Sequence, residues 1–437
     1  MRLPPVAAYF RARLQFFSRP AIALNQASYP AKSLGIDPAL ISTEAVDVAS
    51  RLSKAGFPTW LVGGGVRDLL LGITPKDFDL VTCARPQQIV KLFPRAQQVG
   101  RRFILVLLPL GRGQHLEIAT LRKSPKAISH EGIIIDDNNW SDSITDDVKR
   151  RDFTLNALYM DPVQGTVQDF TGGIEHIRQG QIHMIGDPEL RLAEDPARIL
   201  RLLRMQAKYQ LKVPEQLLKT AKKKAALVRK LPAARWLLEM EKLLLRGYSQ
   251  TSIQLLREFK LLPMQYMPGE KALSAKLGYD VGRLWQQILS STDRHSERKY
   301  GTASQRSLNV QWSGLLAALL WPACQLKSLH TKIPSDPDLW LNWTDAIVLK
   351  QPFLQSTKQQ RASIAQIWRI QASLERDRVP PNLLRSNHFS QALWTALMRK
   401  RAGDASMAKL DHAKWKSANS QVRTHNRRKP RGRRTKP

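Results

Sequence analysis

Cysteine is nearly absent from this 437-residue chain, which contains only Cys83 and Cys324. The two do not form a Cys-x-x-Cys pair, and neither stands at the spacing from histidines that suits zinc. We therefore expect neither a disulfide framework nor a structural metal ion to organise the fold.

Long apolar runs and acidic residues are also scarce. No stretch reaches the roughly 18 apolar residues that a membrane-spanning helix needs. Against 69 Lys and Arg there are only 36 Asp and Glu, a formal net charge of +33, which exceeds what solubility requires. Because phosphate contacts supply most sequence-independent affinity for nucleic acid, we predict a nucleic-acid partner and no membrane partner, an anionic membrane surface being the alternative.

The chain is too long for one hydrophobic core, and its patterns change along its length. Short strand-like runs (TWLV, FDLVTC, RFILVLLPL, HLEIATL) alternate with helical segments at first, and amphipathic helical runs dominate after Gly180. Residues 124–142 are typical of a long loop, and residues 293–314 of a linker or a surface loop between helical units. We predict a basic N-terminal arm (1–40), an α/β head with a mixed sheet (41–180), an all-α neck (181–270), a helical RNA-binding body (271–411) and a disordered basic tail (412–437).

The N-terminal arm has no acidic residue before Asp37 and contains Ser, Ala and aromatic residues. An organelle transit peptide and an RNA-contacting arm share this composition. Pro4, Pro5 and Pro20 interrupt the helix that a transit peptide prefers, so we favour the arm and a cytoplasmic protein.

The segment LVGGGVRDLLLG (Leu61–Gly72) predicts a strand, a glycine turn and a helix. Backbone amides at such a turn can hold phosphate. The segment is no dinucleotide fingerprint, because Asp68 stands where a third glycine is required, and it lacks the Gly-Lys-Ser ending of a P-loop. Taken alone, it fits a packing turn equally well.

Asp77 and Asp79 in PKDFDLV decide between these interpretations. Residues two apart on a strand project to the same face, so the two carboxylates converge. Converging carboxylates stay ionised when a cation compensates their repulsion, which suits Mg²⁺ in phosphoryl transfer. A lone Asp-x-Asp pair is usually a solvated strand edge, but here it accompanies a glycine turn. Glu117 and Asp152 are the two candidates for a third catalytic acid.

Two further segments carry candidate ligands. In KRRDFTLNAL, Asn156 would lie near Asp152 if the segment is helical, which suits contact with ribose or phosphate. In AEDPARILRLLR, Asp195 before Pro196 predicts a helix cap with Arg198 on the same side, and Arg198 and Arg201 fit a solvated face. From the residues alone we favour a structural role for this second segment.

Five ordered motifs, LVGGGVRD, DFDL, EIATLR, RRDFTLNAL and EDPARILR, together resemble the class II RNA nucleotidyltransferases, the superfamily of bacterial poly(A) polymerases and CCA-adding enzymes. They cover about residues 61–204, and the remainder is similar only through LPAARWLLEMEKLL. The resemblance implies template-independent addition of nucleotides to RNA 3′ ends, with Mg²⁺ as cofactor and ATP as substrate.

The resemblance also implies residue roles. Asp77 and Asp79 bind the metal and act as catalytic acids, with Asp152 or Glu117 completing the set. Asp195 and Arg198 contact the edge of the incoming base. The implied nucleotide-binding set is Gly63, Gly64, Arg67, Asp68, Arg151, Asn156, Asp195 and Arg198.

Enzymes that add AMP and enzymes that add CCA share these motifs, so other features must distinguish the two activities. VGRRFILV (Val99–Val106) is similar to the GRRF signature of poly(A) polymerases, but Leu107 stands where that signature usually has histidine. The basic tail would bind many RNAs without sequence preference, which favours polyadenylation. CCA addition to tRNA is the alternative. A non-catalytic RNA-binding protein is a third hypothesis, although both paired acids are present. The predicted RNA contacts in the tail are Arg427, Arg428, Lys429, Arg431, Arg433 and Arg434.

Overall fold

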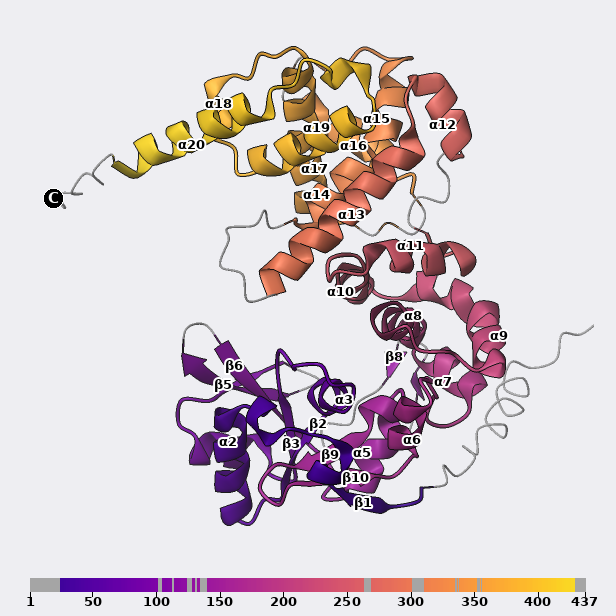
Figure 1. Cartoon of the computed structure of the whole chain (residues 1–437), viewed down its shortest axis with the longest axis vertical. Coiled ribbons are helices and arrows are strands. Elements are labelled where there is room, and N and C mark those ends of the chain that lie inside the picture. The colour runs from indigo at the N-terminus through magenta and orange to yellow at the C-terminus, as the bar shows by residue number, and fades with distance from the viewer. Residues whose placement is uncertain are drawn as a thin grey trace, which may run out of the picture. The chain divides into compact units, whose positions relative to one another are not determined.

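The computed structural model describes residues 24–100, 104–111, 114–123, 128–129, 132–133, 140–262, 269–300, 310–334, 336, 338–351, 354 and 356–428. These residues form two compact units (Figure 1). The first comprises the described residues up to Arg198 together with Gln210–Lys224, and the second comprises Ile199–Tyr209 and the described residues from Ala225 onward.

An eight-stranded mixed sheet organises the first unit, in the order β1-β10-β9-β2-β3-β6-β5-β4. β3 and β6 run parallel, and the other neighbours run antiparallel. A separate pair, β7 (Ile128–Ser129) and β8 (Gly132–Ile133), lies in the expected long loop. The α/β head is thereby confirmed. The strands of the large sheet are β1 (Ala27–Pro30), β2 (Thr59–Val62), β3 (Asp79–Thr82), β4 (Gln97–Val99), β5 (Leu105–Gly111), β6 (Gln114–Thr120), β9 (Leu158–Asp161) and β10 (Thr166–Asp169).

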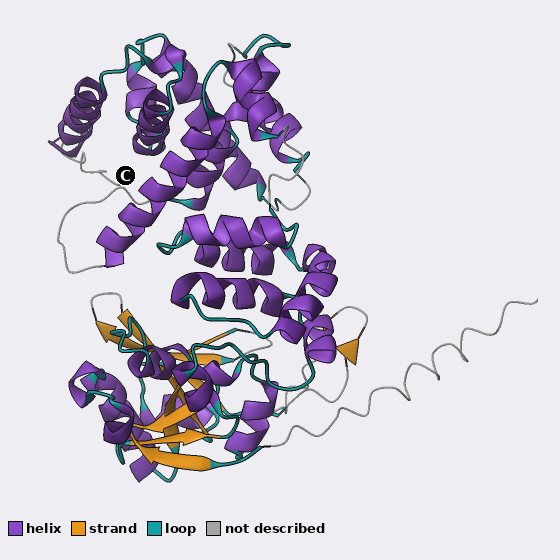
Figure 2. Cartoon of the chain, turned by 45° about the vertical axis from the view of Figure 1, so that its right-hand side comes forward, coloured by secondary structure: helices purple, strands orange, loops and turns teal. Residues whose placement is uncertain are grey.

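Helices pack against this sheet (Figure 2). In α2 (Thr43–Lys54), the Ser42 hydroxyl accepts a hydrogen bond from the Ala45 amide, and the buried apolar side chains follow helical spacing. Gly56, with φ of +86°, comes directly after the helix end. The other helices of this unit are α3 (Gly64–Leu70), α4 (Pro86–Leu92), α5 (Ile144–Arg150), α6 (Gly173–Arg178), α7 (Pro188–Glu194) and α9 (Glu215–Lys224).

Part of the expected N-terminal arm belongs to the sheet. Residues 27–30 form β1, which pairs with β10 along its whole length. Two short 3₁₀ helices follow, Ala31–Leu34 and Pro38–Leu40, and Ala31 and Ile36 are buried. An arm assignment for this stretch was wrong because charge composition does not reveal that an edge strand can cover β10. Residues 1–23 lie outside the described part of the chain.

The second unit is helical, as the amphipathic runs predict. Within the described ranges, no helix is both long and apolar enough to span a membrane. α8 (Ala197–Tyr209) begins in the first unit and continues into the second. The others are α10 (Ala233–Leu244), α11 (Ser249–Glu258), α12 (Glu270–Leu277), α13 (Val281–Tyr300), α14 (Trp312–Leu319), α15 (Trp321–Ser328), α16 (Leu339–Val348), α17 (Lys358–Glu375), α18 (Pro381–Leu384), α19 (Phe389–Arg401) and α20 (His412–Arg428).

The expected linker over residues 293–314 is helical where it begins. Asp293 lies inside α13, is buried, and accepts hydrogen bonds from the amides of Ser249 (2.8 Å) and Gln250 (3.4 Å) at the start of α11. The linker prediction was wrong here because the polar side chains serve tertiary hydrogen bonds instead of solvent. Residues 301–309 lie outside the described residues.

The expected disordered tail begins with a helix. Trp415 and Asn419, four residues apart on α20, are buried, and the α20 backbone packs against α18 and α19. The Trp415 indole donates a hydrogen bond to Asp377 (3.0 Å), and Asn419 donates to the carbonyl of Leu384. Disorder was wrongly predicted for residues 412–428 because two anchoring side chains on one face outweigh a polar composition.

A fully buried arginine, Arg399, connects the helices of the second unit. Its guanidinium lies 2.8 Å from Asp404 and 2.5 Å from Glu375, and it donates to Gln371 (2.9 Å). The same group lies 4.2 Å from the ring centre of Trp321. The positive charge therefore replaces its water shell with two carboxylates, an amide and an aromatic face.

Replacing Arg399 with methionine should destabilise the second unit by about 3–5 kcal/mol, because Asp404 would stay buried without its cation. Arg401→Met, at an exposed position on the same helix, is the matched control and should change stability by less than about 0.5 kcal/mol. Urea denaturation of the full chain compares the two variants. Equal effects would show that the network contributes no stability.

Candidate active site

The glycine turn joins β2 to α3, and two of its glycines are required, one by backbone conformation and one by close packing. Gly63 has φ of +68° and ψ of −125°, a conformation restricted to glycine. A Cβ atom on Gly65 would lie 2.9 Å from the Phe78 ring and 3.4 Å from the Asp77 carbonyl oxygen. The turn therefore packs directly on the segment that carries the acid pair.

The acid pair lies where β3 begins. Asp79 is the first residue of β3, Asp77 precedes it by two, and both are exposed. β3 runs parallel to β6 with Asp79 in register with Glu117, so these two side chains project from neighbouring strands to the same face. Of the two candidates for a third acid, the structure brings Glu117 next to Asp79. Glu117, like Asp79, is exposed.

These acids suit Mg²⁺ better than a metal held by protein alone. In the part of the chain that the structure describes, no three His, Cys, Asp or Glu side chains are grouped so that they could hold a metal ion. Mg²⁺ is typically bound through one or two carboxylates, with water and substrate phosphates completing its shell. Asp77 and Asp79 fit an ion that is shared with a nucleotide.

Asp152 instead belongs to a line of hydrogen-bonded side chains. Its carboxylate accepts from Asn156 (3.1 Å), which lies in a 3₁₀ turn, Thr154–Asn156, so the expected proximity is confirmed. The Asn156 amide oxygen accepts from the Arg67 guanidinium (2.6 Å), which also donates to Asp68 (2.7 Å). Arg67 is buried, and the Asp68 carboxylate compensates its charge. The line connects the glycine turn with the RRD segment.

Arg151 is held by a neighbour that local motifs did not single out. Asp147, almost completely buried, lies 2.9 Å from the Arg151 guanidinium and accepts a hydrogen bond from the Tyr159 hydroxyl (2.8 Å). Burial acts to raise the pKa of Asp147, but the charges of Arg151 and Arg150 outweigh it and lower the pKa below its usual value. The spacing of four residues between Asp147 and Arg151 is the signal that was available in the sequence.

The EDPAR segment is tied to the same region. The Asp195 carboxylate accepts from the Ala197 amide (3.1 Å), which confirms the cap. Arg198 is buried, donates to the Arg191 carbonyl (2.6 Å) and pairs with Glu194 (3.3 Å), so a solvated face was the wrong interpretation for it. Arg191, which the sequence motifs also did not single out, donates to the carbonyls of residues 150 and 151 (2.9 and 2.7 Å). Motifs about 40 residues apart therefore share one hydrogen-bonded frame.

Two histidines stack beside this frame. The rings of His176 and His183 lie 3.8 Å apart, and His176 Nδ1 lies 2.9 Å from the hydroxyl of Thr154, in the turn that carries Asn156. Burial lowers the pKa of both imidazoles, and the His183 ring lowers that of His176 further. Protonation of either ring is therefore disfavoured in the folded protein.

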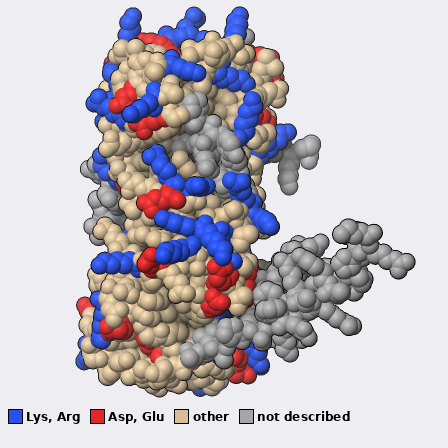
Figure 3. Space-filling model, turned by 90° about the vertical axis from the view of Figure 1, so that its right-hand side faces the viewer, with Lys and Arg blue, Asp and Glu red and all other residues tan. Residues whose placement is uncertain are grey.

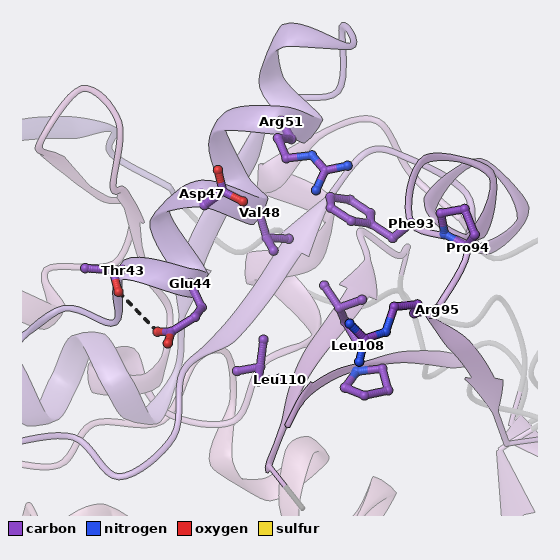
Figure 4. Close-up of a pocket in the computed structure, with 11 residues that line it drawn as sticks. Thr43, Glu44, Asp47, Val48, Arg51, Phe93, Pro94, Arg95, Leu108 and Leu110 are labelled. Carbon is purple, nitrogen blue, oxygen red and sulfur yellow. Dashed lines mark hydrogen bonds between the residues drawn. The ribbon is translucent and has the colours of Figure 1, made fainter. Parts of the chain in front are cut away.

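The cavity in Figure 4 is separate from these residues. It is lined by α2, the segment after α4 and β5, with Arg51 lying 4.5 Å from the ring centre of Phe93. Leu108 in its lining alternates with Leu107, which pairs with Glu117. The cavity therefore lies on the face of the sheet opposite to the acids.

Comparison with known proteins agrees with this arrangement. Residues 59–183 match the model of the poly A polymerase head domain, and residues 210–266 match the probable RNA and SrmB-binding site of polymerase A. The chain belongs to the class II nucleotidyltransferase superfamily. The head match contains every candidate residue of the glycine turn, the acid set and the RRD segment.

Relatives of this nucleotidyltransferase chain carry two names. It is 37% identical over 290 residues to poly(A) polymerase I of Escherichia coli O157:H7, covering 64% of this chain and 60% of the relative. It is 31% identical over 235 residues to the CCA-adding enzyme of Lactococcus lactis, covering 53% and 57%. The solved structure of a tRNA-processing enzyme shares its fold, with 19% identity, a TM-score of 0.54 and coverage of 86% and 99%. The chain therefore spans less than two thirds of the length of the poly(A) polymerase I and of the CCA-adding enzyme that it matches.

The remaining candidate residues lie at the limits of the described chain. Residues 101–103 of the GRRF signature fall outside it, whereas Leu107 is half-buried in β5 opposite Glu117. The backbone of Arg427 and Arg428 forms the end of α20. Lys429, Arg431, Arg433 and Arg434 lie outside the described residues.

Substituting Gly65 with alanine should destabilise the first unit by about 1–3 kcal/mol, because the new methyl group overlaps the Phe78 ring. Gly64→Ala is the matched control: its Cβ would meet only the end of Arg67 at 3.5 Å, and a helical alanine should be neutral or stabilising. Thermal unfolding of both variants tests this, and an equally stable Gly65→Ala protein would refute the close packing.

The histidine pair predicts a pH effect on stability. Because both folded-state pKa values lie below the unfolded value of about 6.5, the unfolded chain binds more protons, and stability should fall as pH decreases through this region. His176→Gln should reduce the fall in melting temperature between pH 7.5 and 5.5, whereas His330→Gln, at an exposed position, should leave it unchanged. Identical pH profiles for the two variants would contradict the role of the stack.

Proposed function

We propose that this chain adds AMP from ATP to the 3′ ends of RNA without a template, releasing pyrophosphate. The observation that carries the proposal is the register of β3 and β6, which places Glu117 beside Asp79. Asp77 lies two residues before Asp79, in the segment on which the glycine turn packs. Membership of the nucleotidyltransferase superfamily supports the reaction class. The basic surface of the chain, part of which Figure 3 shows in blue, supports a polyanionic substrate.

Each part of the site has a task in this reaction. Asp77 and Asp79 would hold Mg²⁺, and Glu117 adds negative charge beside them. A bound Mg²⁺ would lower the pKa of the attacking 3′-hydroxyl and neutralise the negative charge of the triphosphate. The hydroxyl oxygen bonds to the α-phosphorus of ATP while the bond to pyrophosphate breaks.

The buried frame would position the nucleotide. Arg67, Asn156 and Asp152 form a connected line, so the polar groups of the turn are fixed before a substrate arrives. We assign Asp195 and Arg198 to the base edge, because Arg191 and Glu194 hold Arg198 and its helix start in place. Gly63 and Gly64 would face the triphosphate.

Polyadenylation is preferred to CCA addition because the poly(A) polymerase I relatives match at higher identity and over more residues. The relatives are bacterial, which supports a cytoplasmic, bacterial-type enzyme. CCA addition remains the alternative, since enzymes with that name also match the head and neck.

The product assay separates these activities. The full chain is incubated with Mg²⁺, one nucleotide at a time, and either a short unstructured RNA or a tRNA that lacks its CCA end. We expect long A-tails from ATP alone on the unstructured RNA. Addition that requires CTP and stops after CCA on tRNA would replace the proposal with the alternative, and no extension would favour a non-catalytic RNA-binding protein.

Asp79→Asn should lower the extension rate at least about 100-fold, because the loss of a metal ligand removes several kcal/mol of transition-state stabilisation. Asp47→Asn, an exposed acid lining the separate cavity, is the matched control and should extend RNA at the wild-type rate. Melting temperatures establish that both variants fold. A fully active Asp79→Asn enzyme would refute the metal assignment.

A further inference from the structure

Tyr159 adds a hydroxyl group to the ion pair between Asp147 and Arg151. This hydroxyl donates to Asp147 Oδ2 (2.8 Å) and accepts from Arg151 Nε (2.8 Å). Arg151 Nε also lies 3.0 Å from the same Asp147 oxygen, which closes a triangle of three polar groups. Asp147 lies on α5, Arg151 follows the last residue of that helix, and Tyr159 lies on β9. We call these three residues the Arg151 triad.

The triad anchors one edge of the Arg151 guanidinium. The Nε and Nη2 atoms of this edge face Asp147. On the opposite side, Nη1 donates to the carbonyl of Asn156 (3.0 Å) and lies 3.8 Å from where a Cβ atom on Gly63 would be. Because the guanidinium is planar and rigid, an anchor at one edge determines where the opposite side lies. The triad therefore sets the position of the group that contacts Asn156 and lies beside the glycine turn.

Asn156 extends this support to α3. Its carbonyl accepts from Arg151, while its side chain accepts from Arg67 (2.6 Å) and donates to Asp152 (3.1 Å). Arg67 lies on α3, the helix that follows Gly63. A shift of Arg151 would therefore move the residue that links Arg67 to Asp152.

The hydroxyl of Tyr159 keeps its role as a donor across the physiological pH range. Burial raises the pKa of Tyr159, and the charge of Asp147 contributes in the same direction against the attraction of Arg151. The ring itself packs edge-on against Phe170, with ring centres 6.1 Å apart. A phenylalanine at position 159 would keep this packing and lose only the hydrogen bonds of the triad. The chain therefore offers a substitution that separates positioning from packing.

We propose that Asp147 and Tyr159 are positioning residues for the nucleotide, because they hold Arg151 where it supports Asn156 and the glycine turn. The inference rests on the proposed function for its nucleoside triphosphate substrate. Asp147 is 4% exposed and Tyr159 0%, so both act through Arg151 and not by contact with the nucleotide. The substrate concerned is the triphosphate and not the RNA, because the groups that the triad supports are those proposed to hold the nucleotide.

The first test removes the hydroxyl alone. Tyr159→Phe should weaken the binding of ATP and Mg²⁺ to the full chain at least about fivefold, the effect of one lost hydrogen bond, and should raise KM for ATP by a similar factor. The affinity for a short unstructured RNA should be unchanged. Tyr29→Phe, at an exposed position on β1 of the same sheet, is the matched control and should bind ATP with wild-type affinity. Titration calorimetry measures ATP binding without RNA, and thermal unfolding establishes that each variant is folded.

A second variant tests whether Tyr159 acts through Arg151. Arg151→Lys keeps a positive charge near Asp147 but lacks the planar group that reaches Asn156, so ATP binding should weaken at least about tenfold. In that background, Tyr159→Phe should weaken ATP binding no further, since both changes remove the same contact.

Three results would overturn the positioning role. They are wild-type ATP affinity in either single variant, additive losses in the double variant, and equal losses of RNA and ATP affinity, which indicate a general loss of structure. Should Tyr159→Phe not fold, the ATP affinity of Arg151→Lys alone decides.

The extension assay distinguishes this proposal from the proposed function. A wild-type chain that extends RNA, with a Tyr159→Phe variant that binds ATP normally, would refute the positioning role alone. A wild-type chain that binds ATP but adds no AMP to RNA would refute the proposed function, and the calorimetric comparison would then still decide the role of the triad.

Discussion

Arg151 carries its positive charge against the central sheet, where the Asp147 carboxylate and the Tyr159 hydroxyl are its partners. The same guanidinium donates to the carbonyl of Asn156, and Arg191 donates to the carbonyl of Arg151. Because Asp147 and Tyr159 are buried and the other groups are partly buried, displacing one leaves its partner unsatisfied at a cost of about 1–3 kcal/mol. The glycine turn, the RRD segment and the EDPAR helix start are thus held by one network.

In the candidate site, the positive side chains of the frame are buried and the negative side chains at the strand edges are exposed. The arginines of the frame, such as Arg67 and Arg198, are buried and already paired within the protein. The acids at the strand edges, Asp77, Asp79 and Glu117, are exposed. A rigid cationic interior beside accessible carboxylates is suited to a reaction in which a metal ion and a polyanionic substrate arrive together, because the scaffold needs no rearrangement to receive them.

The second unit uses charge differently. Arg399 lies in a network with enough acids and amides to satisfy it, which makes that network a structural element. A buried cation whose charge is matched by carboxylates and amides in this way forms an internal ion pair and holds helices together.

Local spacing was sufficient for much of the site. The strand and helix boundaries around the glycine turn and the proximity of Asn156 to Asp152 follow from periods of two and about four residues, and these periods act within a few positions. The pairing of Glu117 with Asp79 was not available in this way, because it depends on the register of two parallel strands that lie far apart in the chain. The burial of Arg198, the helical contacts of Asp293 and the anchoring of α20 by Trp415 likewise arise from distant partners. The sequence by itself determined which residues can carry the chemistry, through local geometry and charge, whereas only the tertiary structure decided which of them meet, since strand register and side-chain burial are set by contacts between segments far apart in the chain.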